Sequence, residues 1–422
     1  MFVELPAGVL CAVGLAGLID GHYPRESRAA LIFLGFVCLV PLFQLIPLPA
    51  TYWSNLPGHA VPAEISRLVG LGGQPRPISL SPEQTQLGAL ALIIPVGVFI
   101  ATLQVGMIGR DRLLLVVVGF AFVSAVLGVF QTAAGGGFHL DIYPQVHEGY
   151  PIGFFANRNH EGDLLLIALP ASAQVIRSAA VRDKTRISLM IGGVLFFSLA
   201  VVSTQSRTAV SLLPLALCCS LAVWIGNLRD RRIWIGFAAL IAVVLISVAI
   251  VELTPVGHRL LLRFTTIGDD LRPEIWKNTL EAMGAFWPTG SGVGSFIPVY
   301  QMFEDLNSVR DTWVNHAHND YLEILLETGL VGAILILIYF VLAVVSLFAD
   351  APRPLRGQRY VAVSAILILV AHSLTDYPLR TFGLLSVFAL ANGMLFLPRE
   401  RIRIRRRGTY PASPPPDFVP EG

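Results

Sequence analysis

The sequence predicts an all-α polytopic membrane protein with about eleven transmembrane helices, within a range of ten to twelve. Three observations lead to this prediction: the composition, the length of the apolar stretches and the distribution of basic residues. Apolar residues make up 54% of the 422 residues, charged residues only 14%, and the mean hydropathy is +0.67. A soluble domain carries roughly a quarter charged residues, so the composition indicates that the bilayer is the main solvent of this chain.

The apolar stretches have the length that a membrane span requires. A helix needs about 20 mostly apolar residues to cross the hydrocarbon core. Such stretches lie at 5–19, 29–46, 86–105, 113–132, 162–180, 187–202, 209–225, 233–251, 321–348, 360–374 and 381–397. The first and the tenth are short, which accounts for the range in the count. Few ionisable residues interrupt the stretches, so the helix interiors are expected to be almost free of charge.

The basic residues indicate which way the chain faces. When the loops are numbered alternately, twenty of the 30 Lys and Arg residues fall in one set, although the loops of the other set are far longer. Because basic residues favour cytoplasmic loops, we expect the C-terminus inside and the long loops outside. These outer segments are 47–85, 133–161 and 252–320. Within the first of them, 61–71 is amphipathic enough to lie at the membrane surface.

The chain therefore divides into four parts. Residues 1–251 hold the N-terminal transmembrane helices, and 252–320 form a large outer loop before the third-last helix. Residues 321–397 hold the C-terminal helices, and 398–422 form a basic, Pro-rich inner tail. The outer loop contains three Trp residues and few Ser or Gln runs, so we expect it to fold and to carry function. The bilayer is an expected partner, and nucleic acid is not.

The segment Asn315-His-Ala-His318-Asn-Asp320-Tyr-Leu-Glu323 runs directly into an apolar helix. Asp320 and Glu323 have the spacing of a capping box, which predicts His318 just outside or at the first turn of that helix. A helix N-terminus disfavours a cationic imidazole, so His318 is expected to stay neutral and able to act as a general base. A loop histidine that only binds its neighbours is one alternative. A metal site of His316, His318 and Asp320 is another, although no third ligand has a zincin-like spacing.

The helix after His318 is expected to present a smooth face beneath it. At 100° per residue, Gly329 and Gly332 fall on the same stripe as His318, while Glu323 and Glu327 fall on the far side. A glycine-lined face suits a prenyl chain or a closely packed helix. The two glutamates are therefore poor candidates as catalytic partners of His318.

Several arginines lie at the predicted outer ends of helices. Arg207 belongs to Ser203-Thr-Gln-Ser-Arg207-Thr, a turn so short that the guanidinium must lie at or below the outer interface, where it needs an anionic partner. Arg158, Arg272 and Arg380 also lie on the outer side. Guanidinium groups bind phosphate bidentately, so such a set is typical of a pyrophosphate site. Anchoring to lipid headgroups is the alternative.

Three other features are interpreted as structural. Gly290-Ser-Gly-Val-Gly294 lacks the Lys-Ser/Thr of a phosphate loop and is expected to form tight turns. His372, inside an apolar stretch, is expected to be a core histidine with its bonds satisfied. The four cysteines all fall in apolar stretches and have no metal-binding spacing, so no metal or cofactor is expected.

Taken together, these segments resemble the O-antigen ligase and O-antigen polymerase superfamily of bacterial membrane glycosyltransferases. The ligases carry His, then Asn, Ser or Gln, nine residues, and Gly-x-x-Gly. The chain has His318-Asn319, DYLEILLET and Gly329-Leu-Val-Gly332, and similar stretches at Gly153-Phe-Phe-Ala-Asn157 and Arg272-Pro-Glu-Ile-Trp276. The resemblance covers about 150–397. The arginine motif of the family, Arg-x-x-x-Leu, is altered here, because Ser211 takes the place of the leucine and Leu212 follows one position late.

The resemblance implies a GT-C-like helical fold and a metal-independent, inverting glycan transfer on the periplasmic face of a bacterial inner membrane. Arg207 and Arg272 then hold the pyrophosphate of an undecaprenyl-pyrophosphate-linked donor, and His318 deprotonates or orients the acceptor hydroxyl. Further contacts to sugar or phosphate are expected from Asn157, Arg158, His316, Asn319 and Arg380.

The complete motif around His318 favours a ligase that transfers the glycan to lipid A–core. A polymerase, which passes the glycan to the next lipid-linked repeat, is the alternative within the superfamily. A polysaccharide transporter or flippase is less favoured, since the sequence has no internal repeat and few ionisable residues within its helices.

Overall fold

The computed structural model describes residues 4–19, 27–133, 142–143, 149–226, 231, 235, 271–305, 309, 313–348 and 355–396. Three predicted features lie wholly or mostly outside the described residues: the apolar stretch 233–251, the first part of the outer loop at 252–270, and the tail 398–422.

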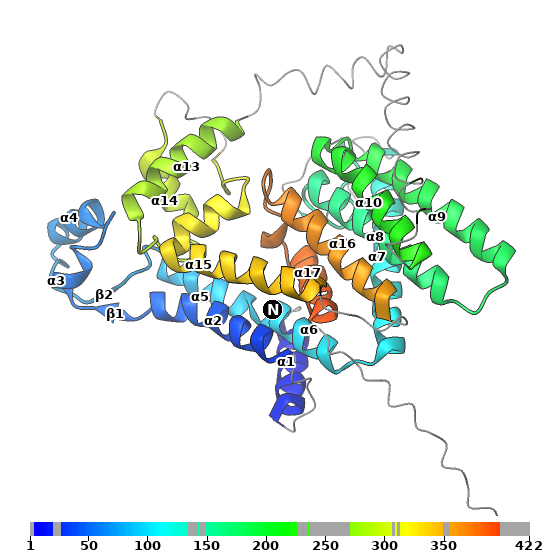
Figure 1. The fold of residues 1–422 in the computed structure, drawn as a ribbon. Coiled ribbons are helices and arrows are strands. Elements are labelled where there is room, and N and C mark those ends of the chain that lie inside the picture. Colours follow the sequence, from blue (N-terminus) through cyan, green and yellow to red (C-terminus); the bar gives the residue numbers. More distant parts are fainter. Residues whose placement is uncertain are drawn as a thin grey trace, which may run out of the picture.

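The described chain is helical apart from one short pair of strands (Figure 1). β1 (Pro47–Leu48) and β2 (Arg76–Pro77) pair antiparallel, with Pro47 opposite Pro77. The helices of the first half are α1 (Glu4–Ile19), α2 (Arg28–Gln44), α3 (Ala50–Trp53), α4 (Ala60–Leu68), α5 (Pro82–Ala91), α6 (Ile93–Gln104), α7 (Met107–Ala133), α8 (Arg158–Ser178), α9 (Asp183–Ser203) and α10 (Arg207–Ile225). The second half has α13 (Arg272–Phe286), α14 (Phe296–Phe303), α15 (Asp320–Phe348), α16 (Arg356–His372), the 3-10 turn η5 (Pro378–Arg380) and α17 (Phe382–Leu395).

Within the described residues, five helices are long and apolar enough to cross a membrane. They are Pro82–Gln104 (α5 with α6), α7, α9, α10 and α15, and Gly8–Ile19, α2 and α17 are shorter apolar helices. These helices confirm the predicted class of an all-α, multi-pass membrane protein. The number of spans stays a prediction.

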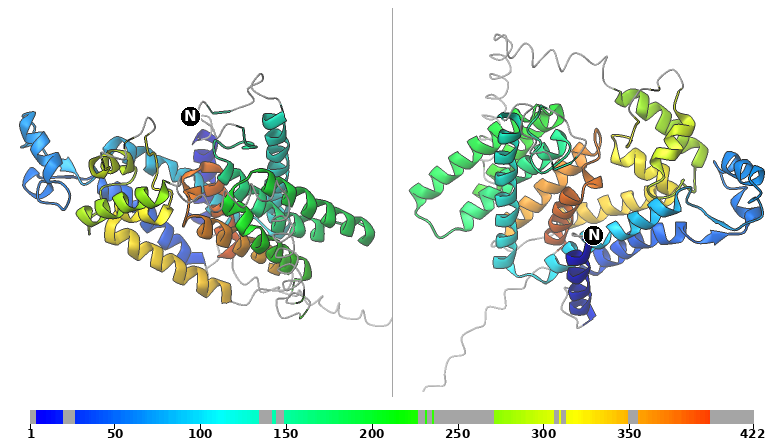
Figure 2. Two further views of the ribbon diagram at one scale, coloured as in Figure 1. Left: turned by 90° about the horizontal axis from the view of Figure 1, so that it is seen from above. Right: turned by 180° about the vertical axis from the view of Figure 1, so that it is seen from behind.

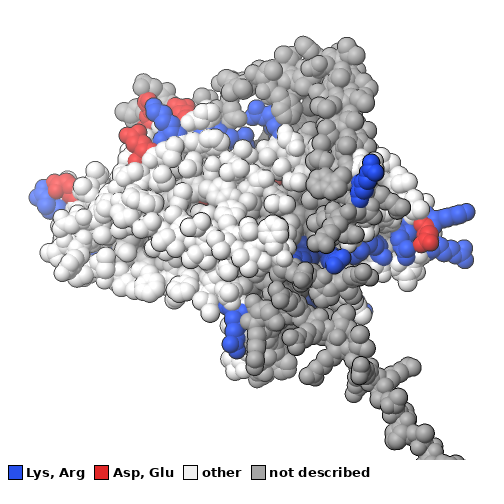
Figure 3. Space-filling view, viewed as in Figure 1, with Lys and Arg blue, Asp and Glu red and all other residues white. Residues whose placement is uncertain are grey.

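The surface of these helices is suited to lipid. Large apolar side chains such as Val116 on α7, Leu199 on α9 and Leu337 on α15 are about two-thirds exposed. In Figure 3 the charged side chains gather toward the margins of the face shown, over α13 and α4 on one side and the end of α9 on the other. The broad uncharged band between them is the expected surface of a protein solvated by hydrocarbon.

Helix α8 lies at the centre of one half of the bundle. It packs against α7, α9, α10 and α16, and every residue from His160 to Gln174 is buried. The buried residues include Glu161 and Asp163, so the interior carries more ionisable groups than the sequence suggested. Both lie in the first two turns of α8. The ionisable groups of α8 therefore remain concentrated at one end of the bundle.

The loops that the charge pattern assigned to the inner side meet one another. Arg110 Nε donates to Gln358 Oε1 at 3.0 Å, and Gln358 Nε2 donates to Asp111 Oδ1 at 2.8 Å. Gln174, at the far end of α8, also donates to Asp111 Oδ1. Three loops that are distant in sequence thus share one polar cluster, as loops on the same side of a membrane can.

The predicted outer segments also meet. The backbone N–H of Leu80 donates to Ser291 O at 3.0 Å, and Thr85 Oγ1 donates to Val293 O at 2.6 Å. These bonds join the beginning of α5 and the residues just before it to the loop between α13 and α14. That loop contains three glycines with positive φ, Gly290, Gly292 and Gly294, which confirms the predicted tight turns.

The prediction of a continuous smooth helix face beneath His318 is wrong. Gly329 has φ 57° and ψ −139°, so α15 is kinked there and the residues before and after it do not share one continuous stripe. A Cβ at Gly329 would lie 2.1 Å from the carbonyl oxygen of Pro288. The glycine is therefore needed for close contact with the outer loop.

Candidate active site

The site is built around the turn that follows α16. Two backbone N–H groups, those of Thr375 and Asp376, donate to the carbonyl of His372 at 2.9 and 3.0 Å and close the end of the helix. Asp320 N, at the start of α15, donates to Ser373 O at 3.0 Å. The turn thus joins the end of α16 to the beginning of α15, and it places Asp376 opposite His318.

His318 precedes α15 and has a positive φ of 49°. Its Nδ1 donates to Asp376 Oδ1 at 3.2 Å; the His318 side chain is 28% exposed and that of Asp376 is fully buried. Because Nδ1 carries the proton toward the carboxylate, Nε2 is the ring nitrogen that can accept a proton. The neutral state of His318 stays a prediction.

Asp376 is held as an anion. Burial by itself raises the pKa of a carboxyl group, but the hydrogen bond from His318 and the nearby His160 and His318 rings outweigh it and hold the pKa of Asp376 well below its usual range. Asn159 Nδ2 donates to Oδ2, and Arg272 Nη2 lies 3.8 Å from the same oxygen. Asp376 can therefore orient His318 and maintain its Nδ1–H tautomer.

The start of α15 differs in one detail from the predicted capping box. Asn319, rather than Asp320, caps the helix: its Oδ1 accepts from the N–H groups of Tyr321 and Leu322 at 3.0 and 3.1 Å. Glu323 reaches back to Ala317 N instead. Asn319 Nδ2 also donates to Leu374 O, so this predicted contact residue ties the helix start to the turn after α16.

His316 lies against the ring of Tyr377. Its Nδ1 donates to Glu323 Oε1 at 2.9 Å, and its ring centroid is 4.2 Å from that of Tyr377. Tyr377 also contacts His318 and His160, each with centroids 5.0 Å apart. As predicted, Glu323 and Glu327 bond to residues other than His318. The three residues of the metal alternative, His316, His318 and Asp320, each bind a different partner.

Tyr377 is a wall of the site that the sequence did not reveal. Burial and the neighbouring Asp376 raise its pKa to about 12, although hydrogen bonds with Asn315 and Asn157 oppose the rise. Asn157 caps α8 by accepting from Asn159 N at 2.9 Å. The predicted residue Asn157 therefore belongs to the site through Tyr377.

Arg207 and Arg272 each begin a helix near this turn. Arg207 is the first residue of α10, and the hydroxyl of the adjacent Thr208 lies 3.3 Å from that of Thr375. Arg272 is the first residue of α13 and faces Asp376, with its side chain 21% exposed. The structure thus brings the helix starts that carry both predicted arginines to the same turn as His318.

The other two arginines have different surroundings. The guanidinium carbon of Arg158 lies 3.9 Å from the ring centroid of Tyr150, a cation–π contact at the start of α8. Arg380 lies among three carboxylates: its Nη2 is 2.9 Å from Glu327, its Nη1 3.4 Å from Glu323 and its Nε 3.8 Å from Asp320. The donors of Arg380 are therefore directed toward α15.

Sequence reasoning missed Asp376, Tyr377 and Asn159. All three lie next to predicted residues, in Asn157-Arg-Asn159 and Asp376-Tyr-Pro-Leu-Arg380, where only the arginines and Asn157 drew attention. One signal could have found Asp376. It follows an apolar helix and lies on the same predicted side of the membrane as His318, the candidate base. Within the described residues no group of three His, Cys, Asp or Glu side chains is arranged to hold a metal ion.

Comparison with known protein families gives one match. Residues 192–337 match the family model described as O-antigen ligase. The matched part contains Arg207, Arg272, His316 and His318, while Asp376 and Tyr377 lie beyond its end. No curated protein matches the sequence.

Proposed function

We propose, from the premise that this chain belongs to the O-antigen ligase and polymerase superfamily, that it transfers a glycan from undecaprenyl pyrophosphate to a hydroxyl of lipid A–core on the periplasmic face of the inner membrane. The single observation that carries the proposal is the pairing of the partly exposed His318 with the buried Asp376, beside the helix starts of Arg207 and Arg272.

His318 is the base in this proposal. Its Nε2 takes the proton of the acceptor hydroxyl while that oxygen attacks the anomeric carbon of the donor sugar. The bond from the same carbon to the pyrophosphate oxygen breaks, and the lipid pyrophosphate leaves as an anion. One displacement inverts the anomeric centre. Asp376 keeps the proton on Nδ1, so that Nε2 faces the acceptor.

Arg207 and Arg272 hold the pyrophosphate. Each lies at a helix N-terminus, where the backbone dipole favours an anion, and each guanidinium can bind phosphate oxygens bidentately. As the leaving group gains charge, both cations stabilise it more strongly than they stabilise the bound donor. Lipid pyrophosphate is already a good leaving group, so orientation and charge can supply much of the acceleration.

The remaining predicted residues shape the site. Asn157 forms a hydrogen bond with Tyr377 and His316 packs against its ring, which suits a surface for a sugar ring; Arg158, next to Asn157, begins α8. Asn319 fixes the backbone around His318. Arg380 was expected to contact phosphate. We propose instead that it holds α15 in place, because its donors face three carboxylates of that helix.

The test is Arg207→Ala, assayed by transfer of labelled glycan in membranes. We expect transfer to be lost while the amount of protein in the membrane is unchanged, and Arg207→Lys to fail as well if bidentate contact matters. Arg67→Ala is the matched control, since Arg67 is an exposed outer-side arginine paired only with Glu64. Near-normal transfer by Arg207→Ala would contradict the pyrophosphate assignment.

The acceptor is tested separately, because the family match covers ligases and polymerases alike. In a strain without this gene, a ligase defect leaves full-length polymer on the undecaprenyl carrier and none on lipid A–core. Single repeats, free or attached to core, would instead identify a polymerase.

A further inference from the structure

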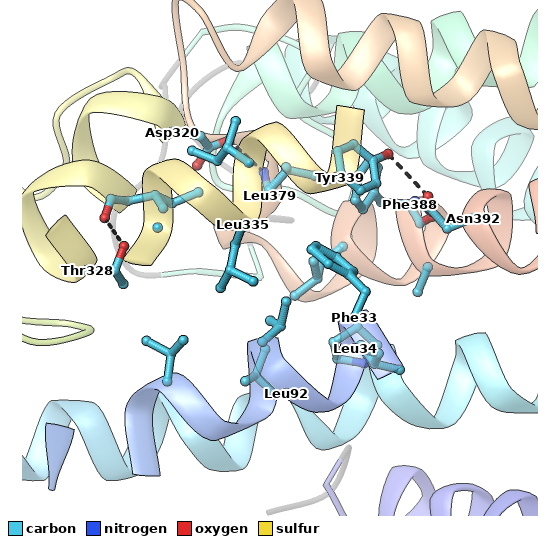
Figure 4. A pocket seen from close by; sticks show the side chains of 18 of the residues that line it. Phe33, Leu34, Leu92, Asp320, Thr328, Leu335, Tyr339, Leu379, Phe388 and Asn392 are labelled. Carbon is cyan, nitrogen blue, oxygen red and sulfur yellow. Dashed lines mark hydrogen bonds between the residues drawn. The ribbon is translucent and has the colours of Figure 1, made fainter. Parts of the chain in front are cut away.

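A long groove lies between α2 and α15, and one of its ends is next to the candidate active site (Figure 4). Its volume is about 460 Å³, within the range of roughly 300–1,000 Å³ typical of small-molecule sites. α2 and α15 run side by side in the views of Figures 1 and 2, and α5, α6 and α17 close the groove. His318, Asp376, Arg207 and Arg272 are not among its lining residues.

The lining of the groove follows most of α15. Along α15 its lining extends from Asp320 to Phe340, a helical distance of about 30 Å at a rise of about 1.5 Å per residue. The hydrocarbon core of a bilayer is also about 30 Å thick. A volume of 460 Å³ spread over that length leaves room for a single extended chain.

The walls of the groove are suited to hydrocarbon. Phe33, Leu34, Leu92 and Leu335 point into it in Figure 4. The polar groups of the walls are already bonded within the protein: Tyr339 Oη donates to Asn392 Oδ1, and Tyr321 Oη donates to Val370 O. The walls therefore offer few polar contacts to a ligand along most of its length.

The outer end of the groove has a different character. Asp320, Glu327 and Arg380 line this end, and with the neighbouring Glu323 three carboxylates contact the guanidinium of Arg380. Asp320 is 1% exposed, and its Oδ1 has no hydrogen-bond donor among the described residues; it lies 3.8 Å from Arg380 Nε. A buried carboxylate oxygen without a donor is costly, so this end is suited to a ligand that brings a hydrogen-bond donor.

We propose that the groove is a second lipid site, which binds one acyl chain of an amine-headed phospholipid with its ammonium group directed toward Asp320. The excess of carboxylates attracts an ammonium and repels a pyrophosphate, so the charge distinguishes this lipid from the polyprenyl donor of the proposed function. The inference does not depend on the transfer chemistry.

Occupation of the groove would have a consequence for the active site. Asp320 is the first residue of α15, two positions after His318, and it accepts from Ser373 Oγ and Leu379 N beside Asp376. A lipid that fills the space between α2 and α15 holds the start of α15 in place. Bilayer composition would then influence how His318 is positioned.

The test is native mass spectrometry of the full-length protein in detergent, with phosphatidylethanolamine, phosphatidylglycerol or undecaprenyl phosphate added at equal concentration. We expect phosphatidylethanolamine to be retained in preference to the two anionic lipids. Asp320→Asn keeps the size of the side chain and is expected to reduce this preference about tenfold, the effect of losing one charge-assisted hydrogen bond.

A second pair of variants tests the groove independently of Asp320. Leu335→Trp fills the groove and is expected to abolish retention, whereas Leu337→Trp, on the exposed face of the same helix, should not. Retention of phosphatidylglycerol or undecaprenyl phosphate at least as strong as that of phosphatidylethanolamine would overturn the proposal. Equal retention by the two Trp variants would overturn it as well.

Discussion

Two Asp–His pairs lie on either side of the turn after α16, and they differ in exposure. His372 Nδ1 donates to Asp163 Oδ1, and both side chains are fully buried. His318 Nδ1 donates to Asp376 Oδ1, but the His318 side chain is 28% exposed. The same chemical pair thus occurs once inside the bundle and once at its surface, only four residues apart along the segment that carries His372 and Asp376.

The comparison shows that exposure, rather than the Asp–His hydrogen bond itself, distinguishes a candidate catalytic pair from a structural one. Asp163 belongs to α8 and His372 to α16, so the inner pair joins two packed helices and no acceptor can reach it. The outer pair has the same bond, yet an edge of its imidazole is accessible. We therefore expect substitutions in the outer pair to affect transfer, and substitutions in the inner pair to affect folding.

His318→Ala is expected to have the largest effect. Loss of a general base lowers the rate by about 10³-fold. The midpoint of thermal unfolding in detergent should fall less than for a fully buried pair, because Asp376 keeps its contacts with Asn159 and Arg272 when the His318 ring is lost. The measurement is transfer of labelled glycan by purified protein, with added imidazole as a rescue. A variant that keeps more than a tenth of the wild-type rate contradicts the assignment of the base.

His372→Ala is expected to reverse this pattern. It leaves the Asp163 carboxylate buried without its partner, which costs about 3–5 kcal/mol in folding free energy. The unfolding midpoint should therefore fall sharply, while the rate per folded molecule stays near that of the wild type. An unchanged midpoint together with a lost rate would contradict the inference that the inner pair acts in folding and the outer pair in transfer.

Asp376→Asn is expected to lower the rate by roughly 10²-fold, less than the loss of the base itself. The amide can no longer hold the proton on His318 Nδ1, so the tautomer that exposes a basic Nε2 becomes less populated. The rate and its pH profile are measured together. An unchanged pH profile in Asp376→Asn would show that Asp376 does not act through His318.

The smallest effect concerns stability in acid. The pKa of Asp376 is lower in the folded protein than its ordinary value of 3.8, so its contribution to stability is complete above that value and is lost as pH falls further. The loss should approach about 1.4 kcal/mol per pH unit. The difference in unfolding midpoint between the wild type and Asp376→Asn should stay constant from pH 7 to about 4.5 and should shrink as pH falls from there to about 2. A difference that stays constant down to that pH would contradict the depressed pKa.

The sequence allowed much of the fold and part of the site to be predicted. The apolar stretches indicated the helices, and the Arg distribution indicated which loops lie together, as the contacts of Asp111 with Gln174 and Gln358 agree. The kink at Gly329 was not predicted, because its cause is the carbonyl of Pro288 in a distant loop. Asp376 was not predicted either, since its 58-residue separation from His318 gives no periodic signal.

The sequence by itself determined the solvent of the chain, the membrane class and the residues His318, Arg207 and Arg272 as candidates. Those features depend on local composition and on short motifs, which can be recognised without knowing which distant residues lie close together. Only the tertiary structure decided which carboxylate pairs with which basic group. Glu323 bonds to His316, Asp376 bonds to His318, and three carboxylates face Arg380. The physical reason is that a hydrogen bond acts over about 3 Å, and only packing of the helices brings these side chains within that range.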